Sequence, residues 1–401
     1  MSLLIGGTLL LVGFAASLVF ERFRLPDFFV LLVLGVVLGH LPYPPFGPTL
    51  AADLGPIVPT FLQLTLALIL FEGGLALQRP ERRGGGHGIL AVHIAVSMGV
   101  TMALTWFLTT AVLGLAPITG LVFAAAFSGP SATIVLSFAP QMNLGPRALG
   151  TIVLEGVLGN VLAAVVVLLA LDLPGVSGLE AIAPYVAYVA LAAAFGAALG
   201  FLWRAATTRL LPYKFQYIAT LGLALVVYAF AEGVLGGNGL VAAFALGLMV
   251  GRRRAEWGAP AESQGGLRAF QSEVTFGLRT FLFVYLGLLI QFESLTLEAL
   301  LGATVLVLGF LVARAPTSVL LGRAYRLPRR ERRVILATIA RGMTDVVLVL
   351  LAVESLLLPP QDVPRVIAVL PLIILGAAVG CGGLLAWAGR GAESPGTAAK
   401  S

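Results

Sequence analysis

A few ionisable and amide side chains lie within long apolar stretches of this chain. Glu155, Arg314, Arg341 and Asp345 are the charged ones, and Asn160 is an amide five residues after Glu155. A charge at the centre of a bilayer costs at least about 2.5–3.5 kcal/mol on insertion scales, so such residues usually pair or line a water-filled cavity. A carboxylate in such a cavity can bind and release a proton or a cation. These residues are therefore candidates for an ion pathway.

The simplest structural interpretation is that these charges neutralise one another and fix the packing of helices. The pairs would be Glu155 with Arg314 and Arg341 with Asp345. The second pair is spaced i, i+4, which places both residues on one helical face if the helix is continuous there. For Glu155 and Arg314 we expect this supporting role. For Asp345, support and direct binding both stay open.

The elements that must position these residues are apolar segments long enough to cross a bilayer. Only 11% of residues are charged, 59% are hydrophobic, and the mean hydropathy is +1.01. These values exclude a soluble chain of 401 residues and predict an all-α polytopic membrane protein. We expect one transmembrane domain over 1–390 and a disordered tail at 391–401. The sequence predicts about thirteen segments, near 2–20, 26–41, 56–77, 88–113, 117–139, 147–171, 182–204, 213–232, 238–251, 269–291, 296–321, 333–356 and 364–389.

Basic residues are distributed unevenly between the connections. All but four of the 25 Lys and Arg lie in every second connection or in the C-terminal tail; the exceptions are Arg279, Arg314, Arg341 and Arg365. Cytoplasmic loops retain Lys and Arg, so we expect the N-terminus outside and the C-terminus in the cytoplasm. The basic loops explain the net charge of +6 and suit contact with anionic membrane lipid rather than nucleic acid.

Two segments contain residues that interrupt a helix. Segment 5 contains Ser128-Gly129-Pro130-Ser131, and segment 12 contains Arg341-Gly342. Proline removes a backbone donor, and glycine frees the backbone. The breaks hold matching positions in segments 1–6 and 8–13, which is typical of an inverted-repeat transporter with a site at the midplane. The alternative is that each break is a simple kink.

Other chemistry finds no support. The chain has no nucleotide-binding glycine motif, nucleophile elbow or HExxH, so we expect neither an enzyme nor a cofactor. Its single cysteine, Cys381, excludes an internal disulfide and a metal–thiolate site. His87 and His93 have no acidic or Cys partner nearby in the sequence, and no metal site is predicted there.

Several motifs occur in a familiar order: Arg24-Leu25-Pro26, LFEGGLAL at the end of segment 3, the stretch 221–251, FLFVYLGLLI at Phe281–Ile290, VARAP at Val312–Pro316 and ARGMTDVVLVLLA at Ala340–Ala352. Together they resemble the monovalent cation/proton antiporters, specifically the NhaP-like sodium/proton exchangers. The resemblance implies a dimerisation domain, a moving core domain with two crossed, interrupted helices, and a homodimer in a bacterial inner (plasma) membrane. It also implies exchange of Na+ or K+ for H+ by alternating access.

The resemblance also assigns residues. That family carries Thr-Asp-Pro on segment 5 and Glu-Ser-x-x-Asn-Asp on segment 6, and the last Asp binds cation and proton in competition. Glu155 then matches the structural Glu, Arg314 its partner, and Arg341 the arginine of the crossed helix. This chain departs from the pattern with Ser128-Gly129-Pro130 and Gly159-Asn160, so both expected carboxylates are replaced. An amide oxygen can coordinate a cation, but an amide does not release a proton near neutral pH.

Asp345, on the segment that corresponds to segment 5 in the repeat, is the acid that we nominate instead. On this hypothesis Asp345 binds H+ or cation, and Arg341 tunes it. Asn160, with the hydroxyls of Ser128 and Thr133, supplies neutral oxygens. Two alternatives stay open. A more positive site with half-helix N-termini could suit an anion or a neutral solute, and the chain could be a non-transporting relative that acts as a sensor or partner subunit.

Overall fold

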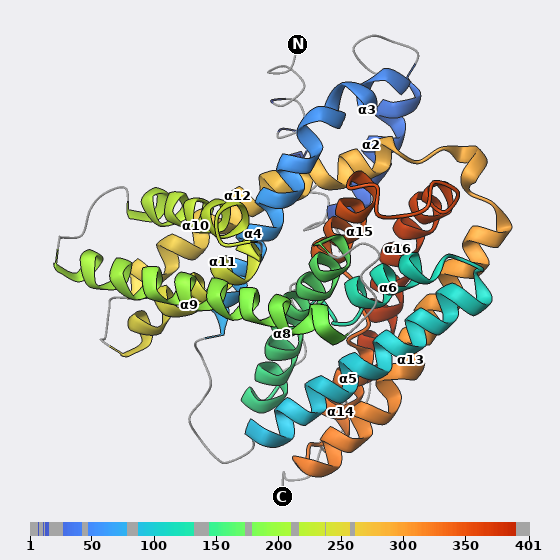
Figure 1. Cartoon of the computed structure of the whole chain (residues 1–401). Helices are drawn as coiled ribbons and strands as arrows, with labels where there is room; N and C mark the ends of the chain where they lie inside the picture. The colour runs from blue at the N-terminus through green and yellow to red at the C-terminus, as the bar shows by residue number, and fades with distance from the viewer. Residues whose placement is uncertain are drawn as a thin grey trace, which may run out of the picture.

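The computed structural model describes residues 27–41, 47–77, 87–131, 144–172, 179–209, 216–236, 238–256 and 261–389, together with 7, 11 and 13–15. These residues contain helices and no strand (Figure 1). The elements are α2 (Asp27–His40), α3 (Pro48–Leu54), η1 (Gly55–Ile57), α4 (Val58–Ala76), α5 (His87–Phe107), η2 (Leu108–Val112), α6 (Pro117–Ala126), α8 (Pro146–Asp172), α9 (Leu179–Arg209), α10 (Gln216–Gly233), α11 (Gly239–Glu256), α12 (Ala261–Leu288), η4 (Phe292–Ser294), α13 (Leu297–Ala324), α14 (Arg329–Ala337), α15 (Met343–Glu354) and α16 (Val363–Gly389).

The predicted segments from 26–41 onward coincide with described helices, with differences at their ends, except that segment 117–139 is described only as far as Ser131. The loop expected between segments 9 and 10 is mostly helical, because Ala, Arg, Glu and Gln extend α11 and α12 into it. A proline in the first turn of α3 starts that helix ahead of α4, so the third span runs over Leu50–Ala76. Segment 2–20 lies mostly outside the described residues, and the tail 391–401 lies outside them entirely.

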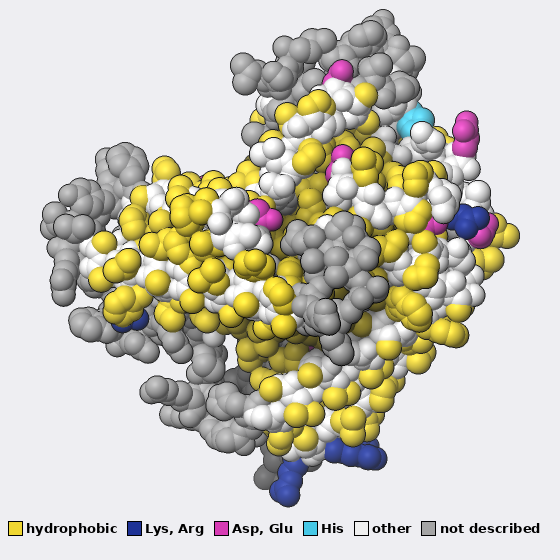
Figure 2. Space-filling view, in the orientation of Figure 1, with side chains coloured by type: hydrophobic (Ala, Val, Ile, Leu, Met, Phe, Trp, Pro, Cys, Tyr) yellow, Lys and Arg dark blue, Asp and Glu magenta, His cyan; other side chains and the backbone are white. Residues whose placement is uncertain are grey.

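The prediction of a helical membrane protein is confirmed by the length and composition of the helices. Seven described helices are apolar and long enough to cross a membrane, and three more are apolar but shorter. Hydrophobic side chains cover most of the face in Figure 2, and Lys and Arg gather at its lower end. On α9, Val186, Leu191 and Leu202 are exposed. Such a large apolar surface is rare on soluble monomers but suits contact with lipid.

The helices surround two apolar cores. In Figure 1, α9–α12 lie on one side and α5, α6, α13, α14 and α16 on the other, with α4, α8 and α15 between them. The larger core takes residues from helices of both sides, and a smaller one joins α4 to α9, α10 and α11. Gly74 of α4 and Gly247 of α11 each lie against the backbone of the other helix. Small residues therefore allow the close approach typical of helices in membranes.

Both interrupted segments are broken where predicted. Helix α6 ends at Ala126 and is followed by the non-helical residues Phe127–Ser131, and residues Thr338–Gly342 separate α14 from α15. The two breaks touch, because the Ser131 N–H donates to the Ala340 carbonyl oxygen over 2.8 Å. We call this contact between the two breaks the crossing. Backbone groups that leave a helix inside a membrane need such partners. The part of segment 5 after Ser131 lies outside the described residues.

Two carboxylates accept hydrogen bonds at the starts of helices and connect the two broken segments to their neighbours. Asp362, immediately before α16, accepts from the N–H of Ala116 over 2.9 Å and from the hydroxyl of Thr119 over 2.6 Å, at the start of α6. Glu331, in the first turn of α14, accepts from the N–H of Gly145 over 2.9 Å, just before α8. Asp362 thus links the start of α6, in broken segment 5, to the start of α16, which follows segment 12. Glu331 links the start of α14, in broken segment 12, to the start of α8, which follows segment 5.

Candidate functional site

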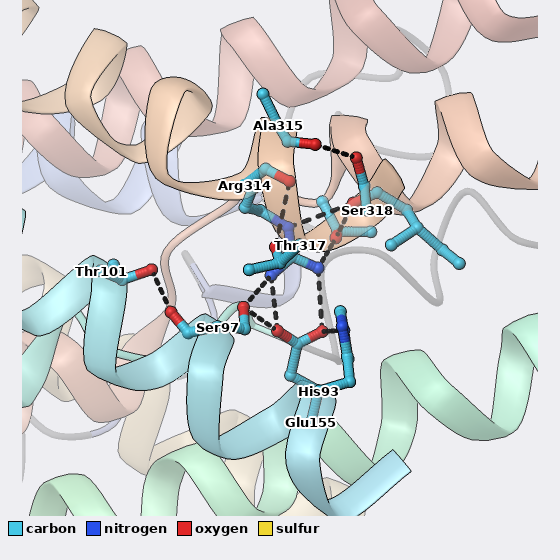
Figure 3. Close-up of polar contacts among 10 residues, drawn as sticks. His93, Ser97, Thr101, Glu155, Arg314, Ala315, Thr317 and Ser318 are labelled. Atoms are coloured by element: carbon cyan, nitrogen blue, oxygen red, sulfur yellow. Dashed lines mark hydrogen bonds and ion pairs between the residues drawn. The ribbon is translucent and has the colours of Figure 1, made fainter. Parts of the chain in front are cut away.

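A buried ion pair lies between α8 and α13 (Figure 3). Arg314 Nη1 donates to Glu155 Oε1 over 2.7 Å, and Arg314 Nη2 donates to Oε2 over 2.9 Å. Ser97, on α5, donates its hydroxyl to Oε1 over 2.7 Å. The Glu155 side chain is 0% exposed and that of Arg314 3%. Two parallel bonds of this kind are among the strongest polar contacts in proteins, so the pair holds three helices together.

The same arginine reaches the interrupted segment 12. Arg314 Nε donates to the Ile335 carbonyl oxygen over 3.1 Å, and Nη2 donates to the hydroxyl of Thr338. That hydroxyl donates in turn to the Ile335 carbonyl over 2.6 Å. The arginine therefore fastens the last turn of α14 and the first residue of the break. This geometry is consistent with the supporting role expected for Glu155 and Arg314.

His93, which the sequence did not mark as a site residue, joins this cluster. Its Nε2 lies 3.7 Å from Glu155 Oε2, and the residue is buried in α5. Its acidic partner lies on another helix, so no partner occurs nearby in the sequence. A signal was present, because His93, Ser97, Thr101 and Thr105 recur every four residues in an apolar helix and are all buried. Within the described residues, His, Cys, Asp and Glu form no group of three that could hold a metal.

Arg341 and Asp345 do not share a helical face, because the helix is interrupted between them. Arg341 donates from Nη1 to the Gly129 carbonyl oxygen, and its guanidinium carbon lies 4.1 Å from the centroid of the Phe310 ring. Among the described residues, no ion pair joins Arg341 to Asp345. The two residues therefore make no direct ion pair, although their charges still interact at longer range. Instead, Arg341 ties the two breaks together and is stabilised by a cation–π contact.

Asp345 lies in the first turn of α15 and is buried, with 3% of its surface exposed. Its Oδ2 accepts from the N–H of Gly342 over 2.6 Å, which satisfies one of the backbone donors at the helix start. A carboxylate in this position also interacts favourably with the helix dipole. The side chain is therefore held at the crossing rather than within an unbroken helix.

The neutral candidates occupy different places. Ser128 is buried, and its Oγ has no hydrogen-bond partner in the described part of the chain. Asn160 is half-buried on α8, and Thr133 lies outside the described residues. Gly129 and Gly159 pack directly together: a Cβ on either would lie 2.9 Å from the Cα of the other. By the resemblance described above, Gly129 stands at the position of the Asp of Thr-Asp-Pro, and Gly159 at that of the Asn of Asn-Asp.

Gly159→Ala should destabilise the protein, because the added Cβ would collide with the backbone of Gly129. The collision could be relieved only if α8 or the segment 5 break moved. Overpacking of this kind typically costs about 1–3 kcal/mol. Thermal unfolding in detergent measures the effect. Gly150→Ala, on the same helix and with nothing within 4 Å of the added Cβ, is the matched control and should be neutral or stabilising. Equal stability of the two variants would contradict the close contact.

Comparison with known proteins gives concordant results. A family profile described as the transmembrane region of sodium/hydrogen exchangers matches residues 7–387. The chain is 24% identical over 368 residues to a protein of Methanocaldococcus jannaschii named probable Na(+)/H(+) antiporter 2, covering 87% of this chain and 83% of that one.

Solved structures of the sodium proton antiporter MjNhaP1 from M. jannaschii have a similar fold. One, at pH 8, matches with a TM-score of 0.79 at 19% identity and covers 95% of this chain and all of the other. Another, from electron microscopy, matches with a TM-score of 0.72 at 21% identity and covers 99% of each chain. From the match over almost its whole length, we conclude that the chain belongs to the sodium/hydrogen exchanger family.

Proposed function

We propose that this protein exchanges a monovalent cation, Na+ or K+, for H+ by alternating access, with Asp345 as the acid that binds the cation or the proton. The position of Asp345 carries the proposal. It is a buried carboxyl in the first turn of α15, three residues after Gly342, and a Cβ on Gly342 would collide with the side chain of Ser131. The acid therefore lies at the crossing, where transporters of this architecture bind their substrates.

The other buried carboxylates in the described residues accept more hydrogen bonds than Asp345 does. Glu155 accepts three hydrogen bonds from Arg314 and Ser97. Asp362 accepts two hydrogen bonds at the start of α6. Asp345 accepts one, from Gly342. A carboxylate offers about four acceptor positions, so Asp345 keeps more capacity for a cation or a proton than Glu155 or Asp362.

Neutral oxygens complete the proposed site. The buried Ser128 hydroxyl, which has no partner in the described part of the chain, and the half-buried Asn160 amide are near the Gly129–Gly159 contact in the sequence. With Thr133, they would supply oxygen ligands, which hard cations prefer. Arg341, engaged with the Gly129 carbonyl, would hold the breaks in place while Asp345 changes its occupant.

The hydrogen bonds that Asp362 and Glu331 accept, which we call the two tethers, support alternating access. In an inverted repeat, segment 5 corresponds to segment 12 and segment 6 to segment 13. The Asp362 tether links the starts of segments 5 and 13, and the Glu331 tether links the starts of segments 12 and 6. The symmetry that relates the two repeats therefore also relates the two tethers. The proposal includes the N-terminus outside, the C-terminus in the cytoplasm, and a homodimer built on a dimerisation subdomain.

Proton flux in proteoliposomes tests the proposal. With a pH-sensitive dye inside the vesicles, addition of Na+ or K+ should evoke a pH change, and equimolar choline should not. No response to Na+, K+ or Li+ would refute cation exchange and favour an anion or neutral solute, or a silent relative.

Asn160→Asp should strengthen cation binding, because it adds a carboxylate of almost the same shape next to the Gly129–Gly159 contact. We expect the apparent KM for Na+ at pH 8 to fall by about tenfold, the change produced by about 1.4 kcal/mol. Initial rates of dye response against Na+ concentration measure it. Gln291→Glu makes the same amide-to-acid change at an exposed position and should leave KM unchanged. A KM equal to that of wild type would remove Asn160 from the site.

A further inference from the structure

One buried titratable side chain, His93 on α5, has no part in the exchange proposed above. It is 6% exposed, and its Nε2 has no hydrogen-bond partner in the described part of the chain. Glu155 Oε2 lies 3.7 Å from it, which is too long for a hydrogen bond but close enough for an ionic contact. A buried nitrogen without a partner carries a free-energy cost, so this arrangement needs an explanation.

The hydrogen bonds of Glu155 leave room for one more donor. Oε1 accepts from Ser97 and from Arg314 Nη1, whereas Oε2 accepts only from Arg314 Nη2. With about four acceptor positions on a carboxylate, one on Oε2 stays open. In Figure 3 the His93 ring faces this oxygen. A proton on Nε2 would therefore have a ready acceptor.

The charged surroundings of His93 are simple. Helix α8 contributes Glu155, and α13 contributes Arg314. Helix α6 has no titratable side chain in its sequence. The other titratable residue of α5 is His87, whose side chain lies outside the described residues. Glu155 is therefore the acid that a charged imidazole would meet in the described part of the chain.

Protonation of His93 would change the hydrogen bonds that Glu155 accepts. An imidazolium donates from both nitrogens, whereas a neutral imidazole donates from one. Its Nε2–H would take the open position on Oε2, and its charge would attract the carboxylate away from Arg314 Nη2, the same nitrogen that donates to Thr338 at the start of the segment 12 break. A proton on His93 would thus loosen Arg314 from the break and add a positive charge in a region of low dielectric constant.

We propose that His93 is a positioning residue of the exchange site, which by binding a second proton withdraws Glu155 from Arg314 and lowers the affinity of the crossing for its cation. Imidazole is the side chain that ordinarily changes charge near physiological pH, which suits this role. The inference rests on the proposed function and deepens it, because it assigns to the transporter a proton that opposes cation binding without occupying Asp345.

The slope of apparent KM for Na+ against pH tests the inference in proteoliposomes. One competing proton raises KM by at most about tenfold for each pH unit, whereas two coupled protons raise it more steeply, towards about a hundredfold. Wild type should show the steeper slope between pH 8 and 6. His93→Gln, whose amide can donate to Oε2 but does not titrate, should show a slope of at most tenfold with kcat little changed. His40→Gln, at an exposed position on α2, is the control and should behave as wild type.

Hydrogen–deuterium exchange at the imidazole C2 position, read by mass spectrometry on wild type, gives a second measurement that does not depend on a variant folding. At pH 6.5, saturating Na+ in place of choline should lower the protonated fraction of His93 and leave that of His40 unchanged. Equal slopes in wild type and His93→Gln, or no effect of Na+ on His93, would overturn this inference and leave the proposed function intact. A wild type that gives no cation-evoked pH change would overturn both.

Discussion

Asp345→Asn is expected to abolish cation-evoked proton movement while the protein stays folded. The amide cannot take up and release a proton near neutral pH, but its carbonyl oxygen can still accept from the Gly342 N–H that Asp345 binds over 2.6 Å. The start of α15 therefore keeps its cap, and the loss is one of chemistry. The measurement is the response of an internal pH dye in proteoliposomes after addition of Na+, K+ or Li+, at matched protein content.

Asp362→Asn is the matched control for this variant. Asp362 is also a buried acid that accepts hydrogen bonds at a helix start, but it lies at the tether between α6 and α16 rather than at the crossing. It should retain proton-coupled exchange. Asp345→Glu, which keeps the acid on a longer side chain, should retain part of the activity. Transport at the wild-type rate by Asp345→Asn would show that the acid of this exchanger lies elsewhere.

Arg314→Met is expected to lower the free energy of unfolding by about 3–5 kcal/mol, because it leaves a buried carboxylate without its counter-ion. Glu155 and Arg314 are 0% and 3% exposed, so solvent cannot replace the lost partner. The double variant Glu155→Gln with Arg314→Met removes both charges and should recover a large part of this loss. Thermal or denaturant unfolding in detergent, followed by tryptophan fluorescence, measures all four species of the double-mutant cycle.

Arg365→Met provides the reference, since Arg365 is exposed at the start of α16 and should change stability by about 0.5 kcal/mol or less. If the double variant were as unstable as the sum of the two single variants, the pair would have no coupling energy. Glu155 and Arg314 would then stabilise the fold independently, and the link from Glu155 through Arg314 to the break of segment 12 would lose its support.

The fold could be predicted from the sequence in its class and in its interruptions. The apolar segments were readable because the requirement to cross a bilayer acts on each stretch of about 20 residues separately. The breaks were readable because Gly129-Pro130 and Gly342 change the backbone locally, whatever surrounds them. The ends of α11 and α12 were misjudged, since a charged but helix-favouring stretch resembles a loop when hydropathy is the guide.

The contacts of the site were predictable only where a buried charge had few possible partners of opposite charge. Glu155 and Arg314 are 159 residues apart, yet each needs an opposite charge within the membrane, and the family resemblance joined them. Arg341 and Asp345 were expected to pair by spacing, but the break separates them, and Arg341 finds a carbonyl and an aromatic ring instead. His93 could not be predicted from its neighbours along the chain, because its partner Glu155 belongs to α8.

By itself, the sequence determined that the chain is a helical membrane protein, where two of its helices break and which charges must be buried. These are properties of single residues or single segments, set by hydrophobicity and backbone freedom. Only the tertiary structure decided which buried groups meet: Gly129 against Gly159, Arg341 at the carbonyl of the other break, and His93 beside Glu155. Inside a bilayer a polar group must satisfy itself on whatever neighbour the helix packing supplies, and that neighbour is not encoded by spacing along the chain.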